Sequence, residues 1–166
     1  MTEKNGSAEI RWGADPVAVG AEAIRLVESG MKCAEAVLSA MARREGVQSH
    51  LIPGIATGFC GGIGRSGNLC GSVSGAVMGL GLTLGRSDTA ESVAPIYNTV
   101  HILLDRFVSE FGSTNCTELL GCNLGTEEGR QQFNRQGLSV RCAAYTRRAA
   151  ELAAELAETS RTPGSS

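Results

Sequence analysis

The sequence predicts an all-α, single-domain helical bundle of about five to six helices with a glycine-rich loop. Apolar residues recur at helical spacing, as in Cys33, Ala36, Val37, Ala40 and Met41. No segment shows the alternation of apolar and polar residues, bounded by turns, that is typical of strands. The 166 residues are 42% apolar and 19% charged, a composition typical of one globular domain with a single core.

The expected domain covers residues 16–158 and begins with two helices. Residues 1–15 are expected to be a flexible lead and residues 159–166 a flexible tail, because both ends are polar and lack periodic apolar positions. A first helix is expected over residues 16–29, since a proline at its start suits a first turn and a glycine follows its end. The second helix is expected over residues 31–46, with Cys33 on its inward face.

A glycine-rich loop follows, with the sequence CGGIGRSGNLCG over residues 60–71. After it, Gly71, Gly75 and Gly79 recur every four residues, so one face of the next helix is a strip without side chains. Glycine costs a helix interior about 1 kcal/mol relative to alanine. The strip therefore predicts that a helix or a cofactor approaches this backbone closely.

The clearest long helix is expected to end at Phe111. Asp88 and Glu91 have the spacing of a capping box, which predicts a start near residue 88. Pro95 lies about two turns further on, so the alternatives are a kink at this proline or a start nearer Ser92.

Three shorter or later segments complete the expected bundle. Ser113 or Thr114 is expected to cap a short turn that ends near Leu120. Residues 127–136 are weakly helical and polar, and a last helix is expected over residues 138–158.

Charge and hydropathy exclude several classes of function. A net charge of -2 and 4% aromatic residues argue against nucleic-acid binding, which needs a basic footprint and often stacking rings. The longest weakly polar run, residues 71–85, is too short to cross about 30 Å of hydrocarbon, so no membrane partner is expected. The N-terminal segment lacks an apolar core behind a basic start, which favours a cytoplasmic location.

The six cysteines are the main candidates for chemistry: Cys33, Cys60, Cys70, Cys116, Cys122 and Cys142. In a reducing compartment such a number indicates metal binding or catalysis rather than a disulfide framework. None of them forms a C-x-x-C pair, which argues against zinc ribbons, thioredoxin-like motifs and ordinary ferredoxin runs.

The cysteines differ in their local setting. Cys33 and Cys142 lie on apolar helix faces, where a small core side chain is one interpretation. Cys70 and Cys116 lie where helices begin, and there the helix dipole and free N–H groups are expected to lower a thiol pKa. Arg65 in the loop is expected to favour the same thiolates.

Four cysteines drawn from four segments match what an iron–sulfur or metal site in a bundle core requires. Glycine N–H groups around the sulfurs would donate hydrogen bonds to them, which explains a loop so poor in side chains. Cys60 and Cys122 receive less weight because they lie in loops beside glycines. The candidate cofactor-binding residues are Gly62, Gly64, Arg65, Gly67, Gly71 and Gly75.

A dinucleotide site is a rival interpretation of the same loop. Gly62, Gly64 and Gly67 spell G-x-G-x-x-G, and Asp88 follows at nearly the right distance. That fingerprint needs a preceding strand and a parallel sheet, which this sequence does not predict. We therefore expect no nucleotide.

The order of motifs resembles a known family. The segments GMKCAEAV, GGIGRSGNLCGSVSGAVMGLGL and FGSTNCTELLG, followed by Cys142, are similar to the C_GCAxxG_C_C family of small redox-active proteins over Gly20 to Ala154. The family element CGAxxG falls on residues 70–75, with Ser72 in place of the usual alanine. The resemblance implies four functional cysteines, which are Cys33, Cys70, Cys116 and Cys142.

The resemblance also implies a redox function. The family is similar to the iron–sulfur portion of split-Soret cytochromes, so the four cysteines are expected to bind an iron–sulfur cluster and to exchange electrons with a redox partner protein. No C-x-x-C-H is present, so no haem is expected. One alternative is a metal-free thiol/disulfide oxidoreductase in which Cys70 attacks. Another is a structural oligomer, such as a homodimer packed through the glycine strip, with zinc or no metal at the cysteines.

Overall fold

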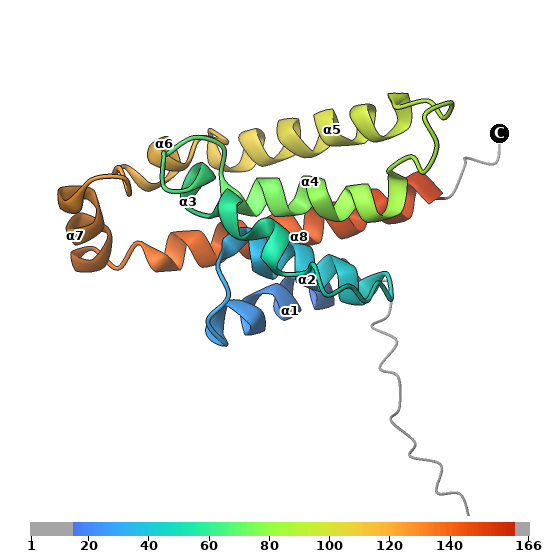
Figure 1. Cartoon of the computed structure of the whole chain (residues 1–166). Helices are drawn as coiled ribbons and strands as arrows, with labels where there is room; N and C mark the ends of the chain where they lie inside the picture. The colour runs from blue at the N-terminus through green and yellow to red at the C-terminus, as the bar shows by residue number, and fades with distance from the viewer. Residues whose placement is uncertain (1–14, 162–166) are drawn as a thin grey trace, which may run out of the picture.

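The computed structural model describes residues 15–161, and all the secondary-structure elements in this part of the chain are helices, joined by loops (Figure 1). The elements are α1 (Pro16–Glu28), α2 (Cys33–Arg44), the 3-10 helix η1 (Gly54–Phe59), α3 (Cys60–Ile63), α4 (Gly71–Leu84), α5 (Ala94–Phe111), α6 (Cys116–Leu120), α7 (Glu127–Arg135) and α8 (Ser139–Arg161). The only β pairing among these residues is an isolated bridge between Leu69 and Asn115. The all-α class is confirmed, and the helix count is higher than expected because η1 and α3 lie in segments expected to be a connection and a loop and are too short to show a period.

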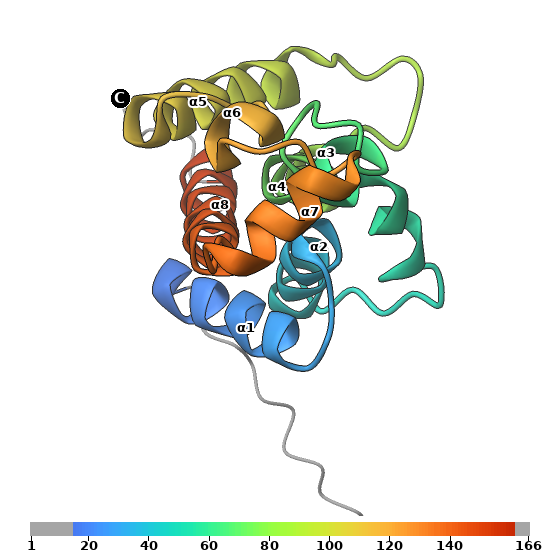
Figure 2. The same ribbon diagram turned by 90° about the vertical axis from the view of Figure 1, so that its left-hand side faces the viewer.

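The long helix α8 forms the centre of the bundle. It packs against α1, α2, α4 and α5, and Figures 1 and 2 show these helices arranged around it. The largest apolar side chains with less than 2% exposure are Val37, Met41, Val73, Leu80, Leu103, Phe107 and Leu152. One continuous core therefore holds the bundle together. None of the helices described is long and apolar enough to span a membrane.

The long helix α5 begins at Ala94, so the start predicted near residue 88 was wrong, whereas the alternative of a start nearer Ser92 is close to the structure. Pro95 lies in its first turn, where a missing N–H costs no hydrogen bond. The Asp88 carboxylate accepts the N–H of Ala90 at 2.7 Å, and Glu91 accepts the N–H of Ser87 at 3.2 Å. These two acidic residues stabilise the preceding loop instead of the helix.

Two other boundaries also differ from the expectation. The cap of α6 is Asn115, whose side chain accepts the N–H of Glu118 at 3.0 Å, and Ser113 instead accepts the N–H of Asn115 at 2.9 Å. The last helix continues to Arg161, three residues into the expected tail. The rest of that tail and residues 1–14 of the expected lead lie outside the described residues.

The glycine strip of α4 is covered by α2 of the same chain. A Cβ on Gly75 would lie 2.7 Å from the Ala34 carbonyl oxygen and 2.9 Å from the Val37 Cβ, and a Cβ on Gly79 would lie 2.6 Å from Met41. The predicted close approach is thus made by a helix at these two positions. Because the strip is buried within one chain, a second copy cannot pack through it.

The short helices gather at one end of the bundle. Figure 1 shows α3, α6 and α7 at this end, and Figure 2 shows them in front of the bundle. The helices α2, α4 and α8 begin close to them. This end therefore combines helix N-termini with loop backbone.

We predict that Gly75→Ala destabilises the protein whereas Gly81→Ala in the same helix does not. The added methyl group at residue 75 clashes with α2, a kind of overpacking that costs about 1–3 kcal/mol. At Gly81 no atom lies within 4 Å of the new Cβ, so only the gain in helix propensity of about 1 kcal/mol remains. Thermal unfolding of both variants measures the difference, and equal melting temperatures would contradict the close packing.

Candidate redox site

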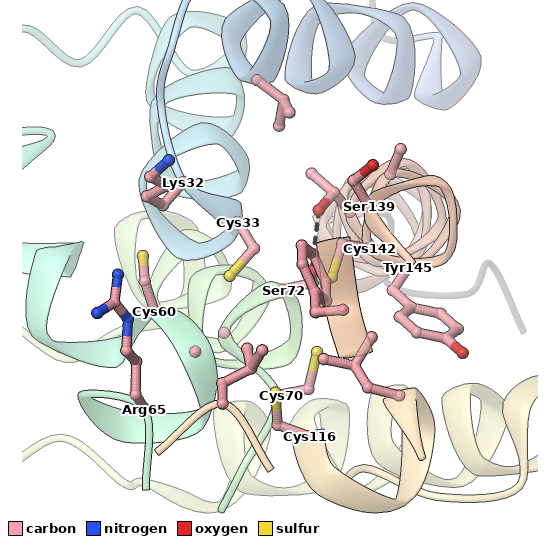
Figure 3. Close-up of a pocket in the computed structure, with 18 of the residues that line it drawn as sticks. Lys32, Cys33, Cys60, Arg65, Cys70, Ser72, Cys116, Ser139, Cys142 and Tyr145 are labelled. Atoms are coloured by element: carbon pink, nitrogen blue, oxygen red, sulfur yellow. Dashed lines mark hydrogen bonds between the residues drawn. The ribbon is translucent and has the colours of Figure 1, made fainter. Parts of the chain in front are cut away.

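A cavity of about 710 Å³ opens at the end of the bundle where the short helices gather. Its volume lies in the range of small-molecule and cofactor sites. Five of the six cysteines line it, and Figure 3 labels all of them. They are Cys33, Cys60, Cys70, Cys116 and Cys142. The structure thus brings together the four cysteines expected as ligands and adds a fifth.

The four expected ligands lie at the beginnings of four different helices. Cys33 is the first residue of α2, and Cys70 is the N-cap of α4. Cys116 is the first residue of α6, and Cys142 lies in the first turn of α8. Their thiols are close enough to raise one another's pKa: Cys70 and Cys142 act on Cys33, and Cys70 acts on Cys116.

The glycine loop reaches this cavity through a left-handed turn. Residues 61–65 have successive φ angles of 69°, 70°, 61°, 58° and 67°. Gly62 combines such a φ with close packing, because a Cβ there would lie 2.5 Å from the Cys116 Cβ. The same region also holds Ile63 and Arg65, which are not glycines and rarely adopt this conformation.

The loop backbone donates to sulfur as expected at Cys33. The N–H of Gly61 donates a hydrogen bond to the Cys33 thiol and lowers its pKa. A Cβ on Gly71 would lie 2.4 Å from the Cys33 Sγ, so a glycine there makes room for the sulfur. Cys70 receives similar support from the N–H groups of Ser72 and Val73.

Burial nevertheless raises the pKa of Cys70 and of two other thiols. Burial is the largest cause at Cys70, which is 6% exposed, and it outweighs the two N–H donors. Burial and then the nearby Cys70 raise the pKa of Cys116 to about 11 and that of Cys142 to about 12. The expectation that helix starts lower the pKa of Cys70 and Cys116 was therefore wrong.

Cys33 is the thiol whose pKa is lowered. The largest cause is the Cys60 thiol, which donates to Cys33, and burial acts in the opposite direction. The same interaction, followed by burial, raises the pKa of Cys60. Arg65 lies beside Cys60 and away from Cys70 in Figure 3, so its expected effect on Cys70 is not found.

The comparison with protein families matches these cysteines to a known pattern. A family model described as "Putative redox-active protein (C_GCAxxG_C_C)" matches residues 31–156. The chain belongs to the C_GCAxxG_C_C family. A search of curated proteins found no match, and a search of solved structures found none either.

The other candidates from the C_GCAxxG_C_C loop divide into two groups. Gly64, Arg65 and Gly71 line the cavity. Gly67 lies outside the lining and packs on Thr117, whereas Gly62 and Gly75 pack on Cys116 and α2 as described above. Contact of any of these residues with a cofactor stays a prediction.

The sequence did not indicate that Cys60 belongs to the site, and it did not predict the polar residues of the cavity. Cys60 is additional to the C_GCAxxG_C_C pattern, and only the fold places it beside Cys33. The Ser72 and Thr146 hydroxyls are 3.0 Å apart in the cavity wall, and the Tyr145 hydroxyl donates to the Leu119 carbonyl oxygen at 2.9 Å. Helical periodicity places such residues on a face but does not indicate that the face lines a cavity.

Cys122 lies apart from the cavity lining. It is buried in a small cluster with Cys116, Leu120 and Leu138, against which Cys142 also packs. Across the described part of the chain, no group of three or more His, Cys, Asp or Glu side chains is arranged to hold a metal ion.

We predict that Cys33 is the first cysteine to be alkylated in the reduced, metal-free protein near pH 7. Only the thiolate reacts, and its fraction rises with pH through the thiol pKa, so the lowered pKa gives Cys33 the largest thiolate fraction at neutral pH. Cys142, whose pKa burial raises to about 12, should react much more slowly than Cys33. The measurement is a pH–rate profile of iodoacetamide labelling, resolved by peptide mass spectrometry.

The matched variants are Cys60→Ala and Cys122→Ala. The first removes the largest cause of the lowered pKa, so the Cys33 profile should move to higher pH. The second removes a thiol that does not act on Cys33 and should leave the profile in place. Fastest labelling at Cys70 would contradict this description of the site.

Proposed function

We propose that this protein is an electron-transfer protein in which Cys33, Cys70, Cys116 and Cys142 bind an iron–sulfur cluster. The observation that carries the proposal is the convergence of these four thiols from four helix beginnings on one cavity. When bound, such a cluster supplies a one-electron couple. A cytoplasmic location and a redox partner protein are part of the same proposal.

The electrostatics of the cavity support a cationic centre. Burial raises the pKa of Cys70, Cys116 and Cys142, and neighbouring thiols raise that of Cys116 and Cys142 further. No positive side chain is among the causes that act on these three thiols. Thiols become ligands only as thiolates, and a metal cation deprotonates them outright. The donor set therefore fits a metal centre, which would supply the missing positive charge.

A cluster places a weaker demand on the spacing of the sulfurs than a single ion does. One zinc ion needs four ligand atoms that nearly touch one another around it. No such group is found in the described residues. In a cluster each cysteine can bind a different iron, so the sulfurs stand further apart. The N–H groups that point at Cys33 and Cys70 would then hold the ligands and tune the potential.

The thiol-only alternative with Cys70 as the attacking group receives less support. An attacking cysteine needs exposure and a substantial thiolate fraction near neutral pH. Cys70 is 6% exposed, and burial raises its pKa. The position of Cys70 instead suits a ligand held by α4.

We predict that protein purified without oxygen contains iron and acid-labile sulfide, and that Cys70→Ser loses most of both. Loss of one thiolate leaves a buried iron without its ligand, because the other four cysteines of the cavity lie at fixed helix or loop positions. Iron and sulfide per chain, with the visible absorption spectrum, measure the result. Cys122→Ser, which lies outside the cavity lining, is the control and should keep its iron. Unchanged iron in Cys70→Ser would remove Cys70 from the ligand set.

A further inference from the structure

Cys60 is the cysteine of the cavity that the C_GCAxxG_C_C pattern does not include, and its nearest thiol is Cys33. The Cys60 thiol donates to Cys33, and the Ala56 carbonyl oxygen is a second acceptor at 3.8 Å. In Figure 3 these two cysteines lie on one side of the cavity, whereas Cys70 and Cys116 lie on the other. Cys33 and Cys60 are thus neighbouring thiols on one side of the cavity.

The backbone around this pair holds the two sulfurs close together. A Cβ placed on Gly71 would be 2.4 Å from the Cys33 Sγ and 3.2 Å from the Cys60 Cα, so both atoms border the same small volume. The Cys60 sulfur also accepts hydrogen bonds from the N–H groups of Glu35 and Ala34 at the beginning of α2. Because the Cys33 Sγ and the Cys60 Cα lie so near the same point, a rotation of the Cys60 side chain brings its sulfur close to that of Cys33.

The rim of the cavity is positively charged. Its lining includes Lys32, Arg65 and Arg130 and no acidic side chain. Arg130 is paired with Glu127 at 2.6 Å, so its charge is largely compensated. Lys32 and Arg65 are exposed, and Figure 3 shows them on the same side as Cys60.

One acidic group lies near this rim. The Glu35 carboxylate accepts the Thr57 hydroxyl at 2.6 Å and the backbone N–H of Lys32 at 2.8 Å, and it does not line the cavity. A molecule that enters the cavity beside Cys60 therefore meets mainly positive charge.

We propose that Cys33 and Cys60 form a dithiol site that reduces a low-molecular-weight disulfide carrying carboxylates. The Cys33 sulfur attacks one sulfur of the substrate, the substrate S–S bond breaks, and the first product leaves as a thiol. Cys60 then attacks the Cys33 sulfur, the mixed disulfide breaks, and the second product thiol leaves. One substrate disulfide gains two electrons and two protons, and Cys33 and Cys60 lose them as they form a disulfide.

The proposal does not depend on an iron–sulfur cluster. It requires only two thiols, and it uses a cysteine that is absent from the proposed ligand set. The two proposals meet at Cys33, which cannot ligate iron and form a disulfide at the same time. Iron is therefore measured on each preparation before chelation, so that failure of one proposal is recognised separately from failure of the other.

The experiment uses the full chain, treated with chelator and reductant, desalted without oxygen and mixed with oxidised glutathione. We expect two glutathione molecules to be released per chain and the tryptic peptide of residues 33–43 to be linked to that of residues 45–65. Trypsin separates Cys33, Cys60, Cys70 and Cys142 onto different peptides, so the pairing is read directly. A disulfide between any other pair, or no exchange, would overturn the proposal.

Two serine variants sharpen the test. Cys60→Ser should stop at the mixed disulfide, with one glutathione retained on Cys33 and one released. Cys122→Ser should behave like the unchanged protein, because Cys122 lies outside the cavity lining. If Cys60→Ser formed an intramolecular disulfide at the original rate, Cys60 would not be the resolving cysteine.

The substrate class is tested by charge. The rate with oxidised glutathione, which is anionic, is divided by the rate with cystamine, a cationic disulfide, at low salt. Combined Lys32→Gln and Arg65→Gln substitutions should lower this ratio several-fold, and comparing ratios removes the intrinsic difference between the two reagents. An unchanged ratio would refute the preference for carboxylates.

Discussion

The packing of α4 on α2 is the constraint on which the rest of the site depends. The side-chain-free face of α4 allows the two helices to approach so closely that a methyl group on Gly75 would strike the Ala34 carbonyl oxygen. The same face continues to Gly71, where the neighbour is the Cys33 sulfur itself. Because Cys33 begins α2 and Cys70 caps α4, the helix contact fixes both sulfurs at the same end of the bundle. The close packing of α4 on α2 is therefore also what positions Cys33 and Cys70 in the cavity.

Two opposing effects set the chemistry of the sulfurs. Helix beginnings and loop N–H groups favour thiolates, whereas burial disfavours any charge. At Cys70 burial has the larger effect and raises the pKa despite two backbone donors. At Cys33 the additional donor Cys60 lowers the pKa in spite of burial. The deep part of the cavity therefore keeps its thiols protonated near neutral pH, and Cys33, beside Cys60, has the lowered pKa. This division is why one cavity supports two different proposals.

The sequence predicted the fold class and most helices because long amphipathic segments repeat a period that can be recognised without tertiary information. It also indicated which four cysteines meet, through their order and their resemblance to a family. It did not decide between a start of α5 near Asp88 and one nearer Ser92, since the spacing of Asp88 and Glu91 is the same in a loop as in a capping box. It could not show that Cys60 belongs to the site, because its partner Cys33 is 27 residues away and the two meet only where η1 and α3 pack on α2.

The left-handed turn also explains how the two sides of the cavity are connected. Non-glycine residues in this conformation cost about 1–3 kcal/mol each, so Ile63 and Arg65 must be held by the surrounding structure. The holding contacts run to α6: the N–H of Cys116 donates to the Asn68 carbonyl oxygen at 2.7 Å, and the N–H of Thr117 donates to that of Gly67 at 3.2 Å. The loop that carries Cys60 is therefore tied to the helix that carries Cys116. These backbone hydrogen bonds fix the position of Cys116 on one side of the cavity relative to the loop that begins at Cys60 on the other.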